Sequence, residues 1–311
     1  MTAASRLVPA TGLPLLYFAF AHFCLALAFA ALVVSPGLPA GFFHHPRMVA
    51  LVHLVTLGWI TSSILGAFYI VGPLALRMPL PAGTLDRLAF AAYAGGVAGM
   101  VSHFWIGEYS GMAWSAGLVI AAVLRVAMRA WTGIVAAPIP WPVKLHVALA
   151  FANMLVASVF GITLGLNRIF GWFAWSAMSA AFAHAHLAAI GWAVMMVVGL
   201  SYRLIPMIVP AAMPTRTSMA LSAVLLEAGI LVLAIGLVRH SAATLPGAIL
   251  ILAGFGSFLA HVRALPTPWA AIAWRDGSCS PGRSVSRCWQ AGWLSRRRRW
   301  SGLGAPACWP G

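Results

Sequence analysis

Three histidines lie in strongly apolar stretches, and they are the residues of this chain best suited to chemistry: His53, His184 and His186. An imidazole within hydrocarbon is costly without a partner, so each of them is a candidate for function. A neutral imidazole nitrogen is also a common ligand of haem iron and of copper. The alternative role for each histidine is an interhelical hydrogen bond. The metal-ligand candidates are therefore these three side chains, and no catalytic residue is identified.

Two of the histidines belong to an internal repeat. The stretch 53–73 recurs, altered, as the stretch 186–206, with a constant offset of 133 residues. Seven of the 21 aligned positions are identical, whereas about two would be expected by chance between apolar stretches of this composition. Each copy therefore places one histidine, His53 or His186, early in a helix of membrane-spanning length.

Glycine and tryptophan pairs follow the histidines in both copies. Gly58 and Gly191 allow close approach of a neighbouring helix or of a flat cofactor. Trp59 and Trp192 are expected inside the bilayer, where they pack against helices or stack on a cofactor. These four residues join the histidines as candidates for cofactor binding.

The H-x-H spacing of His184 and His186 indicates that the two side chains have different roles. Two residues on an α-helix are rotated by about 200°, so the two imidazoles leave the helix on nearly opposite sides. We expect them to serve two neighbouring sites rather than to chelate one ion.

Other polar groups also fall within apolar stretches. Glu227 is expected near the middle of a span, where a carboxyl group must be protonated or paired. A proton relay is one role for it, and a hydrogen bond to Ser222 or to a neighbouring helix is the other. Asn153 is expected to join two helices. Tyr69 and Tyr202 are expected at the membrane interface.

Composition fixes the class of protein. The 311 residues are 62% hydrophobic and only 7% charged, with a mean hydropathy of +0.94. Soluble domains average about 25% charged residues. Lipid cannot satisfy backbone polar groups, so the long apolar runs must be helices, and the fold is an all-α polytopic bundle in two four-helix arcs. The eight expected spans are roughly 13–35, 48–72, 88–106, 112–130, 145–166, 178–205, 217–238 and 243–263.

Basic residues predict the orientation. Nine of those near the spans fall on the side of the N-terminus and three on the opposite side. This asymmetry predicts a cytoplasmic N-terminus in a bacterial-type inner membrane, with lipid as the surrounding partner. The net charge of +15 does not indicate nucleic-acid binding, because the basic residues lie in loops and in a terminal tail.

The chain divides into a membrane domain, 1–264, and a tail, 265–311. The membrane domain contains the repeat, with copies at about 13–130 and 145–263. The tail is rich in Arg, Trp, Cys, Ser, Gly and Pro without periodicity, which is typical of GC-rich coding DNA read in a wrong frame. The alternative is a genuine disordered basic tail at the membrane surface.

A four-helix period with a histidine on the second helix resembles the catalytic subunit of the haem–copper oxidase and nitric oxide reductase superfamily. His53, followed by Gly-Trp, is similar to that family's low-spin haem helix, and His184 and His186 match an H-x-H pair. HAHLAAIG at 184–191 also resembles haem- and copper-containing membrane proteins of the nitric oxide response. The family's H-P-x-V-Y copper motif and its third arc of helices have no counterpart in this sequence.

The resemblance implies a function and its partners. We expect a haem-binding membrane protein of oxidase-like fold, handling electrons or a diatomic gas, with copper as a second cofactor. Its partners would be other respiratory subunits or a cytochrome electron donor. The alternatives are a nitric oxide response protein without turnover and a cofactor-free transporter or scaffold.

Overall fold

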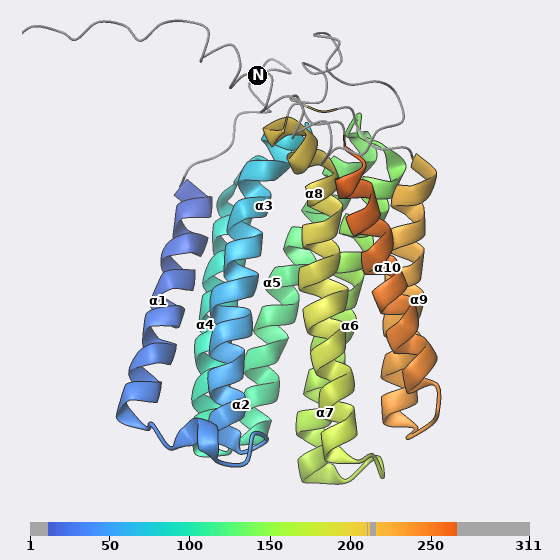
Figure 1. The fold of residues 1–311 in the computed structure, drawn as a ribbon. Helices are drawn as coiled ribbons and strands as arrows, with labels where there is room; N and C mark the ends of the chain where they lie inside the picture. The colour runs from blue at the N-terminus through green and yellow to red at the C-terminus, as the bar shows by residue number, and fades with distance from the viewer. Residues whose placement is uncertain (1–11, 210, 212–215, 266–311) are drawn as a thin grey trace, which may run out of the picture.

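The computed structural model describes residues 12–209, 211 and 216–265, and these residues form a helical bundle without strands (Figure 1). Eight of its helical segments are long and apolar enough to cross a membrane. The chain is therefore an all-α, multi-pass membrane protein, as its composition predicts. Residues 266–311, almost all of the predicted tail, lie outside the described part of the chain.

Six of the eight spans are uninterrupted α-helices. They are α1 (Gly12–Val34), α4 (Thr84–Ile106), α5 (Tyr109–Ala136), α6 (Trp141–Phe170), α9 (Arg216–Val238) and α10 (Thr244–Arg263). A short 3-10 turn, η2 (Leu38–Ala40), lies in the loop after α1.

The remaining two spans are interrupted in their middle by π-helix. The first runs through α2 (Pro46–His53), η3 (Leu54–Thr61) and α3 (Ser62–Ala75), and the second through α7 (Ala177–His186), η4 (Leu187–Val194) and α8 (Met195–Ile208). The two π segments match residue for residue at the repeat offset of 133. Such segments are rare and often mark functional sites.

Burial follows the same repeat, which relates arc 1 (α1–α5) to arc 2 (α6–α10). Each of the six buried residues of α1 has a buried counterpart in α6 at an offset of 129. Buried residues of α4 likewise correspond to buried residues of α9 at an offset of 133; examples are Asp86 with Met219 and Ala89 with Ser222. The helices of the two arcs therefore turn equivalent faces toward the interior.

One hydrophobic core joins the two arcs. Phe68 of arc 1 meets Phe151 of arc 2 with ring centroids 5.4 Å apart. The Trp192 indole donates a hydrogen bond to Thr61 Oγ1 at 3.2 Å, which connects the two π segments directly. Arg203 donates to the Ala75 carbonyl at 2.9 Å. The interface between the arcs is therefore both packed and hydrogen-bonded.

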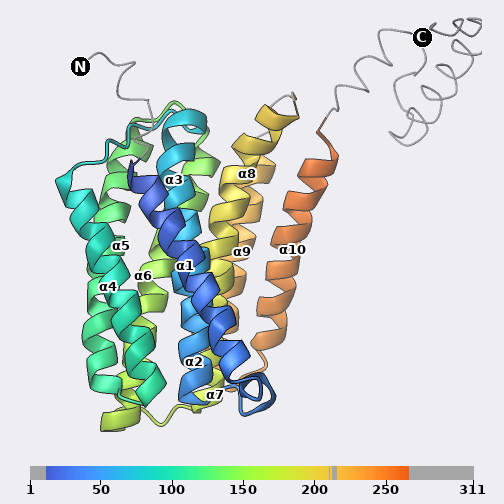
Figure 2. The same ribbon diagram turned by 90° about the vertical axis from the view of Figure 1, so that its left-hand side faces the viewer.

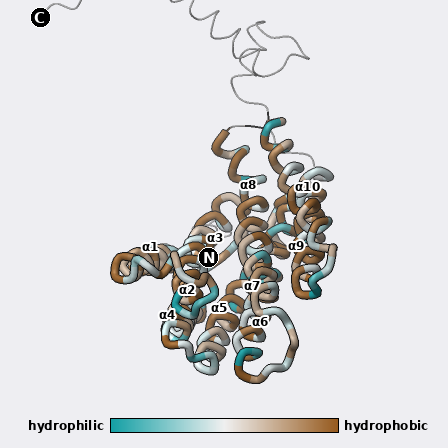
Figure 3. The backbone as a smooth tube through the Cα atoms, turned by 60° about the horizontal axis from the view of Figure 1, so that its bottom comes forward, coloured by the Kyte–Doolittle hydropathy of each residue, from teal (hydrophilic) through white to brown (hydrophobic). Residues whose placement is uncertain are grey.

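The helices lie side by side and roughly parallel to a common axis, with α2 and α7 at one end of the bundle (Figures 1 and 2). Apolar residues follow the helices along most of their length (Figure 3). Large apolar side chains such as Trp114 and Val34 are more than four-fifths exposed on the outer surface, as expected where lipid replaces water.

The tyrosines expected at the interface are instead in the core. Tyr69 and Tyr202 are 1% and 2% exposed, so that prediction is wrong. Each follows its π segment within the same span, and it faces the first helix of its arc: Tyr69 meets Tyr17, and Tyr202 meets His146.

Candidate functional site

Two of the three candidate histidines face each other across the arcs. His53 is the last residue of α2, and His184 lies in the final turn of α7. Their rings have centroids 6.1 Å apart and an interplanar angle of 21°. Each ring therefore stands just ahead of a π segment, at the end of the bundle where α2 and α7 lie (Figure 1).

The hydrogen bonds of these rings fix their proton positions. His53 Nδ1 donates to the Val49 carbonyl at 2.8 Å, and His184 Nδ1 donates to the Ala157 carbonyl at 3.0 Å. A carbonyl oxygen only accepts, so the proton of each neutral imidazole lies on Nδ1 and the lone pair on Nε2. Metal-ligating histidines typically have this arrangement, since the second hydrogen bond orients the ring.

The surroundings of the pair are apolar and closely fitted. The ring of Phe104 lies 4.9 Å from that of His53, centroid to centroid. On the other side, a Cβ added at Gly161 would stand 2.8 Å from His184 Cε1. The absence of a side chain at Gly161 of α6 therefore leaves the space in which the His184 ring lies.

His186 is separated from this pair, although the repeat relates it to His53. Its Nδ1 donates to the Phe182 carbonyl in its own helix at 2.7 Å. The described ring contacts of His53 are with Phe104 and His184 only. The two histidines of the H-x-H pair thus have different surroundings, as the 200° rotation between them predicts.

The glycines of the repeat serve helix packing. A Cβ added at Gly58 would stand 2.6 Å from Cys24 Cβ of α1, and one at Gly191 would stand 2.8 Å from Asn153 Cβ of α6. Both surfaces are therefore occupied by neighbouring helices. Of the two tryptophans, Trp192 is buried against Phe151. Trp59 is only partly buried.

The facing histidines offer two candidate ligands for a metal ion. Within the described residues, no group of three or more His, Cys, Asp or Glu side chains is placed to hold a metal ion. The larger of the two cavities described, about 370 Å³, lies between α5 and α6 and is lined by apolar residues such as Trp131 and Leu155. It does not border either histidine.

Glu227 has a partner in a neighbouring helix. Asn153 Nδ2 of α6 donates to Glu227 Oε2 of α9 at 2.7 Å, so the prediction that Asn153 joins two helices is confirmed. Ser222, the other partner considered for Glu227, instead interacts with His146 and Tyr202. Asn153 also packs against Gly191, so the pair lies beside η4.

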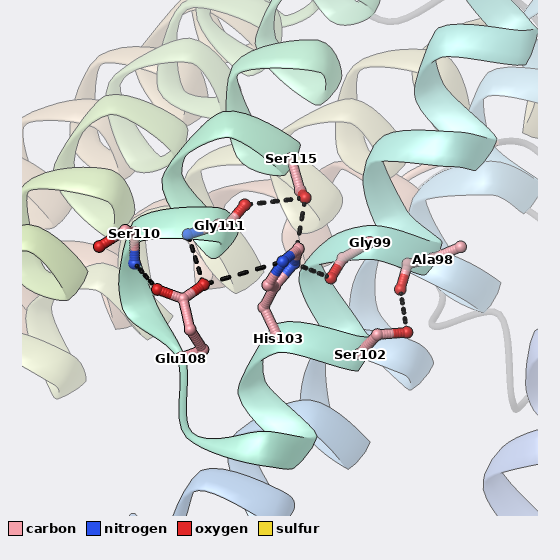
Figure 4. Close-up of polar contacts among 8 residues, drawn as sticks. All are labelled: Ala98, Gly99, Ser102, His103, Glu108, Ser110, Gly111 and Ser115. Carbon is pink, nitrogen blue, oxygen red and sulfur yellow. Dashed lines mark hydrogen bonds and ion pairs between the residues drawn. The ribbon is translucent and has the colours of Figure 1, made fainter.

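A serine, a histidine and a glutamate meet at the turn between α4 and α5 (Figure 4). Ser115 Oγ lies 3.4 Å from His103 Nδ1, and His103 Nε2 lies 3.7 Å from Glu108 Oε2. Nδ1 already donates to the Gly99 carbonyl at 2.6 Å, so it carries a proton and cannot accept one from Ser115. The cluster therefore lacks the base that a nucleophilic serine needs.

Glu108 has a structural role in the same cluster. Its carboxylate accepts hydrogen bonds from the backbone N–H groups of Ser110 and Gly111, which caps the N-terminus of α5. These bonds, the Gly111 N–H foremost, hold the pKa of Glu108 below its usual range, and nearby His103 lowers it further. The cluster thus fixes the α4–α5 turn.

The loop after α1 reaches arc 2 at this end of the bundle. Arg168 of α6 donates to His44 Nδ1 at 2.6 Å and to the Tyr109 hydroxyl at 2.7 Å. Burial, together with the Arg168 guanidinium, lowers the pKa of His44. Phe43 stacks on Phe182 of α7, with centroids 5.7 Å apart. The loop therefore contacts the helix that carries His184.

Sequence reasoning missed an ion pair at the other end of arc 1. Asp86 is 1% exposed, and its Oδ1 lies 3.3 Å from Arg125 NH2 and 4.0 Å from Arg129 Nε. Its Oδ2 accepts from the Gly83 N–H at 2.8 Å. The available signal was the small number of acids: the chain has only four acidic residues against 19 basic ones, so a buried acid has many arginines available as partners.

Comparison with models of protein families finds no match to this sequence, and comparison with curated protein sequences finds no significant match. The resemblance to the oxidase superfamily therefore depends on the histidine, glycine and tryptophan pattern of this chain alone.

Proposed function

We propose that this chain is a metal-binding membrane protein in which His53 and His184 ligate one redox-active metal between the two arcs. One observation carries the proposal. Two imidazoles from different arcs face each other, and each has its Nδ1 bonded to a carbonyl, so that both Nε2 lone pairs are free to ligate. Such a metal would supply one-electron transfer or binding of a diatomic gas.

The spacing of the rings suits a shared ion. Two imidazoles that bind one metal through Nε2, with bonds of about 2.0–2.1 Å, have ring centres about 6.4 Å apart when the two bonds are collinear and closer when they are bent. The observed centroid distance is 6.1 Å. Both the iron of a haem and a copper ion meet this condition, and imidazole is a common ligand of each.

The packing around the pair favours copper over haem. A macrocycle needs a flat surface beside its ligands, and Gly58 and Gly191 were the residues best suited to give one. Cys24 and Asn153 occupy those surfaces. A bare ion needs no such space. Haem is the second candidate, supported by the oxidase-like position of His53.

The residues around the pair hold the rings and keep water away. The Val49 and Ala157 carbonyls orient the two rings, while Phe104 covers the His53 ring. Phe43 and Phe182 stack nearby, where the loop after α1 meets α7. An apolar environment of this kind limits solvent access to a bound metal and so influences its redox potential.

The test is metal content and spectrum of the full-length protein, purified from cells supplied with both haem and copper. We expect about one metal per chain, lost in His53→Ala and in His184→Ala. His186→Ala is the matched control: it lies two residues from His184, bonds only within its own helix, and should keep the metal.

The outcomes separate the candidates. Copper without a Soret band supports the copper ion, and a Soret band lost in both variants supports haem. If neither metal is present in wild type, or if the alanine variants retain it, the proposal is wrong and a cofactor-free transporter or scaffold becomes the best description.

The membrane setting is proposed from charge. Nine basic residues against three favour a cytoplasmic N-terminus in a bacterial-type inner membrane. The histidine pair would then lie toward the outer face, where respiratory subunits or a cytochrome donor could exchange electrons with it. Reporter fusions test the orientation: a fusion after α1 should report the outer side and a fusion after α3 the cytoplasm.

A further inference from the structure

Two tyrosine hydroxyls are buried in arc 1 without a partner. Tyr17 of α1 and Tyr69 of α3 are 0% and 1% exposed, and neither hydroxyl has a hydrogen bond within the described residues. Their rings lie side by side, with centroids 6.2 Å apart and an interplanar angle of 19°. Burial of an unpaired hydroxyl is unfavourable, so each of these groups requires an explanation.

Arc 2 contains the same pair with its hydrogen bonds made. His146 corresponds to Tyr17, and Tyr202 to Tyr69, at the offsets that relate the two arcs. Their ring centroids are 5.5 Å apart. Between them lies the Ser222 hydroxyl, 3.0 Å from His146 Nε2 and 2.9 Å from the Tyr202 hydroxyl. One hydroxyl thus joins both members of the pair.

Arc 1 has no hydroxyl at this position. The counterpart of Ser222 is Ala89 of α4, which is buried at 7% exposure. The glycine contacts that set the helix spacing are nevertheless present in both arcs: Gly66 packs on Tyr17, and Gly199 packs on His146. The hydroxyls of Tyr17 and Tyr69 therefore lack a partner because Ala89 has no hydroxyl where arc 2 has Ser222, while the surrounding backbone is equivalent.

A third unpaired atom lies on α4, one helical turn before Ala89. Asp86 Oδ1 is buried without a hydrogen bond within the described residues, although it is paired by charge with Arg125. Asp86 precedes Ala89 by three residues and Tyr93 by seven, so all three lie on one face of α4, and Tyr93 meets Tyr17 with ring centroids 6.0 Å apart. A buried water typically makes about three hydrogen bonds to otherwise unsatisfied polar groups. The site offers two hydroxyls and a carboxylate oxygen, which match that number.

We propose that arc 1 binds an ordered water molecule among Tyr17, Tyr69 and Asp86, in the place that the Ser222 hydroxyl occupies in arc 2. The water accepts from both phenol O–H groups and donates to Asp86 Oδ1. It therefore links the ion pair at this end of α4 with the tyrosines in the core. Arc 2 makes the equivalent link with protein atoms alone.

A double-mutant cycle tests the site in the full-length protein, purified in detergent or in lipid nanodiscs. Tyr17→Phe and Tyr69→Phe each remove one hydroxyl and almost no volume. We expect each to lower the midpoint of unfolding, because the water loses a partner. The double variant should shift the midpoint by less than the two single shifts combined, since both hydroxyls act through one water.

The opposite result overturns the proposal. If the hydroxyls have no bound water, each Tyr→Phe change removes an unsatisfied group, so the midpoint stays or rises and the two shifts add. A density map that shows ordered water elsewhere in the bundle, but none within hydrogen-bonding distance of Tyr17 and Tyr69, would also overturn it.

Ala89→Ser offers an independent check, because it introduces the arc 2 side chain. The new hydroxyl should displace the water, so the midpoint should hold or rise, and Tyr69→Phe should still lower it, as Tyr202→Phe should in arc 2. Ala150→Ser on α6 is the matched control: Ala150 is equally helical and 0% exposed, and its added hydroxyl should lower the midpoint. If Ala89→Ser lowers the midpoint as much as Ala150→Ser, no water is being replaced.

Discussion

The two arcs share their helix packing and differ in their polar interiors. The π segments, the glycine contacts and the buried faces of α1 and α6 coincide at fixed offsets. Near the N-terminus of the third span of each arc, however, Asp86 of α4 is paired with Arg125, whereas α9 has the buried Met219. Small residues and backbone geometry are therefore common to both arcs, whereas the side chain at an equivalent position can be charged in one arc and apolar in the other.

The histidine pair also combines a backbone that the two arcs share with a side chain that only one of them has. The repeat places His53 and His186 at equivalent positions, yet the ring that faces His53 belongs to His184, which has no counterpart in arc 1 because Leu51 occupies that position. The candidate site therefore arises from the difference between the arcs rather than from their symmetry.

Breaking the ion pair of arc 1 should have the largest effect on stability. Asp86→Ala leaves Arg125 and Arg129 without their acid in a mostly buried place, and removing one partner of a buried pair costs about 3–5 kcal/mol. Chemical unfolding in detergent measures the change. Met219→Ala in arc 2 should cost about 2–5 kcal/mol through lost packing, without the salt dependence expected of Asp86→Ala.

The glycine contacts should differ in tolerance between the arcs. A Cβ at Gly199 would overlap with His146 Cβ, so Gly199→Ala should destabilise by about 1–3 kcal/mol. A Cβ at Gly66 would stand 3.1 Å from Tyr17 Cβ, so Gly66→Ala should cost less. Equal losses for the two variants would contradict the difference in packing that the structure shows.

The hydrogen bond between the arcs should be worth less. Thr61→Val removes the acceptor of the Trp192 indole without changing volume, and the unpaired N–H should cost about 1 kcal/mol. Thr56→Val is the control, because the Thr56 hydroxyl bonds only the Val52 carbonyl of its own helix. Indole fluorescence should change in the first variant alone if the bond forms as described.

The smallest effect concerns the turn before α5, whose N-terminus is capped by Glu108. The corresponding helix of arc 2, α10, begins without a side-chain cap, so a helix at this position forms without one. The folded state lowers the pKa of Glu108, so its contribution to stability is present above the unfolded pKa and is lost as pH falls through the folded pKa. Glu108→Ala should slightly lower the unfolding midpoint near neutral pH and reduce its acid dependence. Glu108→Gln keeps an acceptor oxygen and should lose less stability; an unchanged acid dependence in both would contradict the role of this carboxylate.

The sequence alone predicts the architecture well. Eight expected spans agree with the eight observed ones to within a few residues at most ends, because long apolar runs in lipid leave helices as the available structure. The role of Asn153 could also be predicted, since an amide within a span needs a partner.

The pairing of side chains could not be predicted, for a physical reason. A π segment changes the number of residues per turn, and the sequence gives no direct sign of it. Periodicity therefore could not show which of His184 and His186 faces His53. Periodicity also could not predict that Tyr69 and Tyr202 are buried in the core.

The π segments also bear on the history of the chain. A π turn contains one residue more than the α-helical turn that it replaces, so it arises by a one-residue insertion and disappears by a one-residue deletion. Both arcs have the segment at the same repeat position, Leu54–Thr61 and Leu187–Val194. A single insertion explains both if it preceded the duplication, and this irregularity would then be older than the two-arc bundle itself.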